Sequence, residues 1–276
     1  MKTMKILSAV LLLCLMFQDA TLRDIQKRII GGKPCKKDER HFHVVIYHVQ
    51  DVNKMEDWVC GGSLISSEWI ITAAHCNSRI DSTLWIRLGE HAGHPSLGSE
   101  LIEIEEKNIH LAENCHDLML LKLTNQETKI PPVSLPKCAT ESLFTICGID
   151  FFKPNPQKLK GTEVQIAGFG TIKPDKKNMK VGDTAPALQC ALVDVVEYFI
   201  QPLYMFNNVE KLFRVQRAGV DACPGDSGGG VLHHKKLYGV AVSTDDMRAC
   251  SANTNVMDLC SYKEWITRIT GISFKP

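Results

Sequence analysis

Apolar residues occur along most of the chain in short runs, which are separated by turns rich in Gly, Pro and charged side chains. The alternation of apolar and charged residues is clearest at 101–105, where it indicates a strand with one face exposed to water. The pattern predicts strands at 44–49, 84–88, 101–105, 118–123, 163–168, 192–196 and 237–243. Many short strands with no internal repeat are typical of a β-barrel or sandwich.

The C-terminal segment is the one part of the chain with convincing helical spacing. Ser261 and Glu264 have the spacing of a capping box, in which two side chains satisfy the first amides of a helix. Trp265, Ile266 and Ile269 would then share one apolar face. We therefore predict an all-β protein with a C-terminal α-helix.

The N-terminal segment has the pattern of a secretory signal. Lys2 and Lys5 precede an apolar run over 6–17 that is too short to cross a bilayer, and small Ala20 follows it. We predict a signal peptide at 1–20, a propeptide at 21–28 that ends in Lys27-Arg28, and a mature domain at 29–276. The mature protein is expected to be secreted and extracellular, with no membrane anchor.

Composition supports this prediction and excludes other classes. The chain has 276 residues, of which 44% are hydrophobic and 23% charged, which excludes a disordered chain, a collagen-like repeat and a coiled coil. Its 32 Lys and Arg against 31 Asp and Glu give no reason to expect nucleic acid or an anionic membrane as partner. Of the eleven cysteines, Cys14 lies in the signal, and the even number that remains favours disulfide bonds in a secreted protein.

Three motifs supply a histidine, an aspartate and a serine in that order. They are Thr-Ala-Ala-His-Cys around His75, His-Asp-Leu-Met around Asp117 and Gly-Asp-Ser-Gly-Gly around Ser227. A serine hydroxyl is a poor nucleophile until a base takes its proton, and a carboxylate must hold that base in the correct tautomer. The glycines beside Ser227 let backbone N–H groups approach an oxyanion. The motifs predict nucleophilic hydrolysis.

The segment 225–229 also fits the Gly-x-Ser-x-Gly turn of α/β-hydrolases. That fold needs a helix after the serine and places its histidine last in the chain. Here a predicted strand follows, and His233 and His234 lie too close to Ser227 to serve as ordinary partners. We discount this alternative.

With Ile-Ile-Gly-Gly following a basic pair at 27–28, the chain resembles the chymotrypsin/trypsin family of secreted serine proteases from residue 29 to near its C-terminus. The resemblance implies two six-stranded antiparallel β-barrels, at approximately 29–137 and 138–276. It makes His75 the general base, Asp117 its orienting acid and Ser227 the nucleophile. The N–H groups of Gly225 and Ser227 would form the oxyanion hole.

The resemblance also implies how the protein is activated and cross-linked. Cleavage after Arg28 would free the amino group of Ile29 to pair with Asp226. The implied disulfides are Cys35–Cys190, Cys60–Cys76, Cys138–Cys260 and Cys223–Cys250. Cys115 and Cys147 are left over, and we expect them to form a fifth bridge because secretion disfavours free thiols.

The specificity pocket departs from the trypsin pattern. Asp221 matches the carboxylate at the pocket floor that selects Arg or Lys at P1, the substrate residue before the cleaved bond. Ser243 matches the start of the strand that pairs with substrate, but Asp245 and Thr254 stand where glycines are usual and would narrow the pocket. We expect Arg or Lys at P1, with a small P1 residue as the alternative.

We expect neither a metal nor another cofactor. The histidine pairs match no zinc ligand set, and Leu97 interrupts the acids of a trypsin-like calcium loop at Glu90 and Glu100. The expected partners are protein or peptide substrates, an activating trypsin-like protease and protein protease inhibitors. The competing function is a catalytically impaired homologue that acts as a binding protein.

Overall fold

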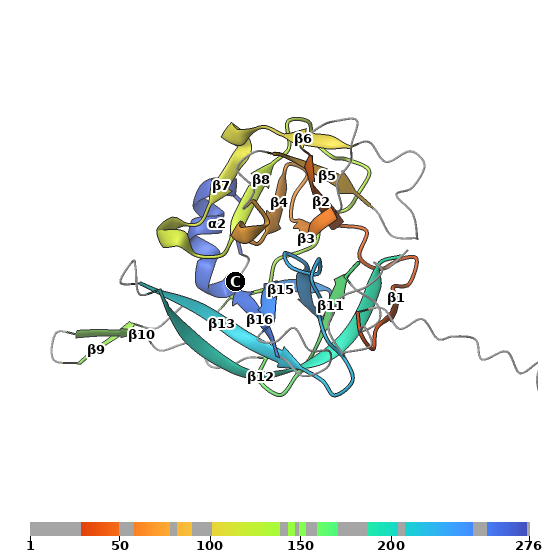
Figure 1. Ribbon diagram of the computed structural model, residues 1–276. Helices are drawn as coiled ribbons and strands as arrows, with labels where there is room; N and C mark the ends of the chain where they lie inside the picture. The colour runs from red at the N-terminus through yellow and green to blue at the C-terminus, as the bar shows by residue number, and fades with distance from the viewer. Residues whose placement is uncertain are drawn as a thin grey trace, which may run out of the picture.

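The computed structural model describes residues 29–49, 58–77, 82–89, 101–138, 143–146, 149–152, 159–170, 187–203, 208–244 and 253–274. Figure 1 shows two antiparallel sheets that lie one above the other, with the C-terminal helix beside the upper sheet. A separate hairpin of β9 (Leu143–Ile146) and β10 (Ile149–Phe152) extends away from both sheets.

The first sheet has the strand order β6-β5-β2-β3-β4-β8-β7. Its strands are β2 (His43–Val49), β3 (Trp58–Leu64), β4 (Trp69–Thr72), β5 (Thr83–Leu88), β6 (Ile102–Ile104), β7 (Ile109–Leu111) and β8 (Met119–Lys122). Only Glu105 and the 3-10 turn η2 (Glu106–Asn108) separate β6 from β7. Since β6 pairs with β5 and β7 pairs with β8, this bent segment joins both edges and curls the sheet into a barrel.

The second sheet has the strand order β1-β12-β11-β14-β15-β16-β13. Its strands are β1 (Lys33–Pro34), β11 (Glu163–Gly168), β12 (Gln189–Leu203), β13 (Asn208–Gln216), β14 (Gly230–His233), β15 (Lys236–Thr244) and β16 (Thr254–Asp258). Because β12 also pairs with β13, six strands close on themselves and β1 adds at the edge of β12.

The expected fold class is therefore confirmed: two antiparallel barrel-like sheets and a C-terminal helix. Each predicted strand overlaps an observed one, but the segment 192–196 is only the middle of β12. The sequence pattern did not predict the hairpin that β12 forms with β13. Part of this hairpin stands away from the core, so exposed residues such as Ile200 and Val209 interrupt the burial pattern.

The helix α2 (Lys263–Thr270) begins later than a capping box at Ser261 requires, so that prediction was wrong. A 3-10 turn, η4 (Leu259–Tyr262), comes first, and Ser261 Oγ donates to Asp258 Oδ2 instead. The predicted apolar face is correct, since Ile266 is fully buried and Trp265 nearly so. Among the described residues, no helix has the length and apolar content needed to cross a membrane.

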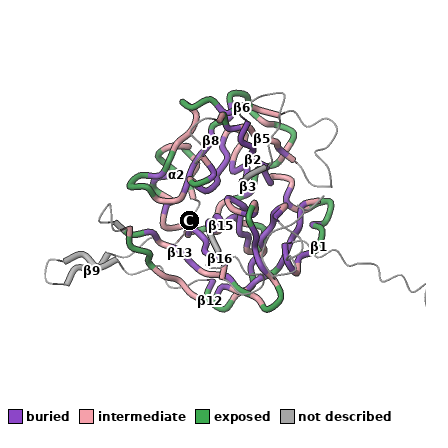
Figure 2. Tube along the Cα trace, in the orientation of Figure 1, coloured by how far each residue is buried: buried purple, intermediate pink, exposed green. Residues whose placement is uncertain are grey.

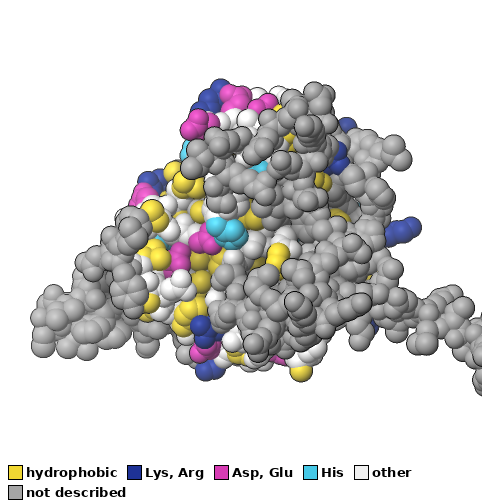
Figure 3. Space-filling view, in the orientation of Figure 1, with side chains coloured by type: hydrophobic (Ala, Val, Ile, Leu, Met, Phe, Trp, Pro, Cys, Tyr) yellow, Lys and Arg dark blue, Asp and Glu magenta, His cyan; other side chains and the backbone are white. Residues whose placement is uncertain are grey.

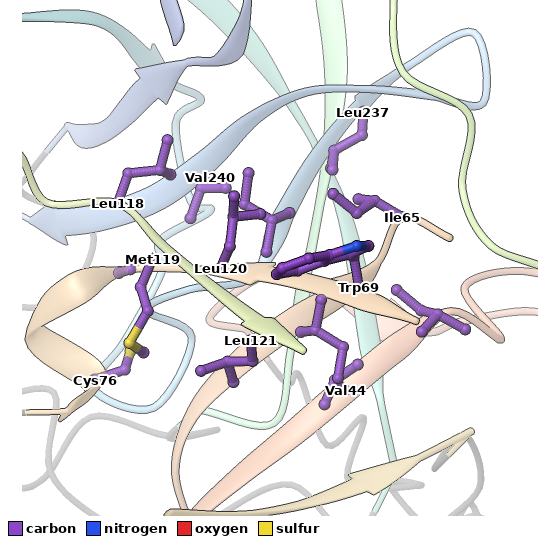
Figure 4. Packing of buried hydrophobic residues seen from close by; sticks show 14 of the residues in the cluster. Val44, Ile65, Trp69, Cys76, Leu118, Met119, Leu120, Leu121, Leu237 and Val240 are labelled. Atoms are coloured by element: carbon purple, nitrogen blue, oxygen red, sulfur yellow. The ribbon is translucent and has the colours of Figure 1, made fainter. Parts of the chain in front are cut away.

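Buried apolar side chains fill the interior of each barrel-like sheet and the space between the two sheets. Figure 2 shows buried residues along the strands, with exposed residues mainly at the turns. One cluster contains Leu120 of β8, Leu237 and Val240 of β15, and Trp265 of α2, so that it spans both halves of the molecule. Figure 4 shows Trp69 in the middle of this cluster, with side chains from β8 and β15 around it. This shared core fixes the relative position of the two barrels.

Arg40, which precedes β2, reaches the second sheet although its side chain is buried. Its Nη1 donates to the Gly230 carbonyl oxygen at 2.6 Å, and its Nε donates to Gln165 Oε1 at 3.0 Å. Burial lowers the pKa of Arg40 to about 9, and the nearby Glu39 carboxylate opposes this shift. Arg40 remains charged at neutral pH, and its hydrogen bonds join the first half of the chain to the strand that follows the Ser227 loop.

Three of the four implied disulfides are present: Cys35–Cys190, Cys60–Cys76 and Cys138–Cys260. Cys250, the expected partner of Cys223, lies outside the described residues. Cys115 is exposed and carries a free thiol, so the fifth bridge that we expected to Cys147 is not formed; Cys147 itself also lies outside the described residues.

Candidate active site

His75 and Asp117 form two hydrogen bonds with each other on the first barrel. The His75 ring nitrogen Nδ1 lies 2.8 Å from Asp117 Oδ2, and the His75 backbone N–H donates to Asp117 Oδ1 at 2.8 Å. Because an ionised carboxylate can only accept, Nδ1 donates this hydrogen bond, and Nε2 takes no part in it. Figure 3 shows a histidine beside acidic side chains near the centre of this face.

The turn that carries His75 is held by bonds inside the first barrel. His75 lies in η1 (Ala74–Asn77), directly after the buried strand β4. Thr72 Oγ1 donates to the Gly61 carbonyl oxygen at 2.8 Å, and the Cys60–Cys76 disulfide closes the turn from the other side. The His75 side chain is 41% exposed, so its ring is accessible from solvent.

Asp117 lies at the end of a short connection between β7 and β8. The connection contains η3 (Glu113–Cys115), in which Asn114 and Cys115 have left-handed backbone angles. The buried Leu118 follows and leads directly into the apolar strand β8. The Asp117 side chain is 27% exposed, so this short connection leaves the carboxylate partly open to solvent.

Ser227 comes from the second barrel and lies against β3 of the first. Its carbonyl oxygen accepts from the Gly61 N–H at 2.7 Å, and Cys76 Sγ lies 3.9 Å from the same oxygen. Gly228 has a φ of +80°, and a Cβ at this position would overlap the Gly61 carbonyl oxygen and Thr72 Oγ1. This close approach brings the Ser227 loop beside the turn that carries His75.

The residues before Ser227 fold into a tight loop around the buried Asp226. Asp226 Oδ1 accepts from the Gly170 N–H at 2.7 Å, and Oδ2 accepts from the Cys223 N–H at 2.8 Å. Gly225 has a φ of +95°, which favours glycine. Within the part of the chain that the structure describes, neither the Gly225 nor the Ser227 amide donates a hydrogen bond to the protein. These are the two amides that the sequence resemblance assigns to an oxyanion hole.

The first described residues pack into the second barrel. Ile29 is fully buried in the apolar cluster that contains Ala222, and the Ile30 carbonyl oxygen accepts from the Asp221 N–H at 2.9 Å. Arg28 lies outside the described residues, as do the signal peptide and propeptide that we expect at 1–28. The start of the predicted mature chain thus lies beside the segment that leads to Ser227.

A pocket of about 210 Å³ adjoins Ser227. Its described lining comes from the Ser227 loop, β15 and β16: Ala222, Cys223, Pro224, Asp226, Ser227, Ala241, Val242 and Thr254. Asp221 is not among these lining residues and is only 2% exposed. Thr254 lines the pocket as expected, the strand β15 includes Ser243, and Asp245 lies outside the described residues.

Glu210 is a buried acid near the site that our sequence analysis did not identify. Its Oε1 accepts from the Asp117 backbone N–H at 2.7 Å, and the residue is 4% exposed. Burial raises the pKa of Glu210, the Asp117 charge raises it further, and the hydrogen bond from Asp117 opposes both effects. Glu210 lies two residues before the buried Leu212, so both side chains lie on the buried face of β13. The sequence could have indicated Glu210 through this spacing, but we had not predicted the strand.

One group of three side chains near the site contains atom types that can bind metal ions. Cys60, His75 and Cys76 place ligand atoms within 4.8 Å of one another. The two cysteines form a disulfide and so provide no thiolate to bind a metal. The calcium-loop positions Glu90, Leu97 and Glu100 lie outside the described residues.

Comparison with known proteins agrees with this geometry. A snake venom serine protease of Trimeresurus stejnegeri, KN2, is 28% identical over 87% of this chain and 86% of its own length. Ussurin, a venom serine protease of Gloydius ussuriensis, is also 28% identical, over 87% of this chain and 95% of its own length. The solved structure of neuropsin, a serine protease of mouse brain, has a TM-score of 0.60 at 22% identity and covers 86% of this chain and 98% of neuropsin.

The family comparison covers most of the chain. The model of the family described as Trypsin matches residues 29–266, which include both barrels and all three motifs. This match also begins at the residue where we placed the start of the mature domain. The chain therefore belongs to the trypsin family of serine endopeptidases.

Proposed function

We propose that this protein is a secreted zymogen that becomes an active endopeptidase after cleavage at Arg28, and that Ser227, His75 and Asp117 perform the hydrolysis. The observation that carries the proposal is the Nδ1–Oδ2 hydrogen bond of 2.8 Å between His75 and Asp117. It leaves the Nε2 lone pair of the His75 ring available as the general base.

The reaction would proceed by acyl transfer. Ser227 Oγ attacks the carbonyl carbon of the cleaved bond while its proton moves to His75 Nε2, and Asp117 stabilises the imidazolium that forms. The amides of Gly225 and Ser227 donate to the oxyanion. His75 then protonates the leaving amine, and water hydrolyses the acyl-enzyme with the same base. Removing one oxyanion donor typically costs about 100-fold to 1,000-fold in kcat.

Activation would act through the buried Asp226. Cleavage after Arg28 creates an ammonium on Ile29, and a buried carboxylate is stabilised by a cation that is buried with it. The burial of Ile29 and the contact of Ile30 with Asp221 support this route, because they hold the start of the mature chain beside the Ser227 loop. Removal of a signal peptide at 1–20 and secretion would precede this step.

Two candidates remain for the P1 residue. A buried carboxylate at Asp221 favours Arg or Lys, because a charge-assisted hydrogen bond would satisfy it. The lining of the pocket beside Ser227 favours a small P1 residue, because Thr254 and Val242 contribute to it and Asp221 does not. Protein or peptide substrates, an activating trypsin-like protease and protein protease inhibitors are the partners that follow from an endopeptidase zymogen.

Active-site labelling tests the proposal. The purified proform is treated with trypsin and then with a fluorophosphonate probe, beside the variants Ser227→Ala and Arg28→Gln. We expect labelling of the processed wild type, none of Ser227→Ala, and no processing of Arg28→Gln at this site. A processed wild type that stays unlabelled would favour the binding-protein alternative. A peptide library with varied P1 residues then decides between Arg or Lys and small side chains.

A further inference from the structure

Glu210 connects the second barrel to the backbone of Asp117. It lies near the start of β13, where Gln201 of β12 is its cross-strand partner. Along this strand Val209 is exposed, Glu210 is buried and Leu212 is buried. Glu210 therefore points to the same side as Leu212, which belongs to the core shared by both barrels.

The hydrogen bond from the Asp117 N–H offsets part of the cost of burying Glu210. A carboxylate that is 4% exposed loses most of its hydration, and such a group is tolerated only where N–H groups replace the water. The Asp117 N–H lies 2.7 Å from Glu210 Oε1 and supplies this replacement. A hydrogen bond with an ionised acceptor is about twice as strong as a neutral one. When Glu210 is ionised, the contact therefore restrains the Asp117 backbone more strongly than a neutral hydrogen bond would.

Asp117 needs such a restraint because its carboxylate must bond two different groups of His75. The ring nitrogen and the backbone N–H of His75 each bond a separate carboxylate oxygen at 2.8 Å, which fixes both the position and the rotation of the carboxylate. The connection before Asp117 contains two residues with left-handed backbone angles, and the Asp117 side chain is 27% exposed. A buried anchor on the opposite barrel can hold this segment in register with His75.

Asp117 and Tyr262 are titratable groups close enough to Glu210 to interact with its charge. Tyr262 of η4 packs nearby, and its pKa is raised mainly by burial and further by the charges of Glu210, Asp258 and Asp117. The ring of His116 lies edge-on to Tyr262 at 5.4 Å between ring centroids, and burial lowers the pKa of His116. Lys211, the next residue of β13, carries the nearest basic side chain in the sequence.

We propose that Glu210 is a positioning residue of the active site: it holds the backbone of Asp117 so that Asp117 presents both carboxylate oxygens to His75. The proposal rests on the catalytic roles proposed above for Asp117 and His75. A second consequence follows from charge. An ionised Glu210 places a negative charge behind Asp117, and this charge stabilises the protonated form of His75 that arises during catalysis.

The test compares Glu210→Gln with Glu210→Ala in the activated full-length protein. Glutamine keeps an oxygen that can accept from the Asp117 N–H but removes the charge, whereas alanine removes both. Glu103→Gln on β6 is the matched control, because Glu103 is an exposed acid in the same molecule. Steady-state kinetics over pH 5–9 (about the range in which histidine titrates) give kcat, KM and the acid limb of kcat/KM for each variant.

We expect Glu210→Ala to lower kcat about 10-fold to 100-fold with KM changed less than about 2-fold, since small displacements of catalytic groups have effects of this size. Glu210→Gln should retain kcat within about 3-fold and move the acid limb of kcat/KM to lower pH, because protonated His75 loses a stabilising charge. Glu103→Gln should change neither quantity. An alanine variant with wild-type kcat, or a glutamine variant as impaired as alanine, overturns the proposal.

An NMR measurement separates failure of this proposal from failure of the proposed function. The Nδ1 proton of His75 in its hydrogen bond to Asp117 gives a downfield resonance whether or not the protein hydrolyses peptides. We expect this resonance in the wild type and in Glu210→Gln, and its broadening or loss in Glu210→Ala. A wild type that shows the resonance but hydrolyses nothing contradicts the proposed function alone. An unchanged resonance in Glu210→Ala contradicts the positioning role alone.

Discussion

Gly228→Ala tests how the close contact of the two barrels positions Ser227. Gly228 has a φ of +80°, and an alanine in that region costs about 1–2 kcal/mol. A Cβ at Gly228 would also overlap the Gly61 carbonyl oxygen and Thr72 Oγ1, and such overpacking typically adds about 1–3 kcal/mol. We therefore expect Gly228→Ala to lower the free energy of unfolding by about 2–5 kcal/mol, which leaves the protein folded if its stability is about 5–15 kcal/mol.

The same overlap must separate the Ser227 loop from β3. Gly61 N–H donates to the Ser227 carbonyl oxygen at 2.7 Å, so separation of the two backbones moves the Ser227 loop away from β3 and from the turn that carries His75. A shift of about 1 Å can lower the rate about 100-fold. We expect the fluorophosphonate labelling rate of the activated variant to fall by about this factor.

Gly161→Ala is the matched control. Gly161 has a φ of +76°, and an added Cβ there meets no atom within 4 Å. It should show the backbone cost of about 1–2 kcal/mol in urea unfolding and no change in the labelling rate. Labelling of Gly228→Ala at the wild-type rate, or an equal loss of labelling in Gly161→Ala, would contradict the view that this close contact positions the Ser227 loop.

Three further predictions concern the pocket, a disulfide and pH. Thr254→Gly should raise kcat/KM for Arg substrates relative to Ala substrates in a P1 library, because it removes a buried side chain from the pocket wall; an unchanged ratio would contradict this role. Replacing Cys60 and Cys76 together by Ser should lower the unfolding free energy by about 3 kcal/mol, measured in urea, and a change below about 1 kcal/mol would contradict it. The pKa of Glu210 is raised in the folded protein, so the folded protein binds this proton more tightly than the unfolded chain does. The free energy of unfolding of the wild type should therefore fall as pH rises from about 4.3, the ordinary pKa of Glu, through the pKa of Glu210 in the folded protein. Glu210→Gln should lack this component, and identical pH profiles of the two proteins in urea unfolding would contradict it.

Local sequence patterns predicted the all-β fold class, and the motifs predicted the family to which the chain belongs. Alternating and continuous apolar runs located strands such as β2, β5 and β11, because a residue's burial in a strand follows its side-chain direction. The motifs around His75, Asp117 and Ser227 could be recognised because each reactive residue lies in a short segment with its own turn or strand chemistry. The resemblance that these motifs carry also predicted the three disulfides that form.

Contacts between distant segments were decided only by the tertiary structure. The Ser261–Glu264 capping box failed because Asp258 accepts the Ser261 hydroxyl and caps a 3-10 turn first. The free thiol of Cys115 could not be read from an even cysteine count, because a disulfide needs two side chains at bonding distance as well as two cysteines. In the sequence, Glu210 is one acidic residue in a segment that mixes apolar, acidic and basic side chains. It lies beside Asp117 only because the packing of the two barrels brings its carboxylate oxygen within 2.7 Å of the Asp117 backbone nitrogen, a contact across 93 residues of chain that no local pattern encodes.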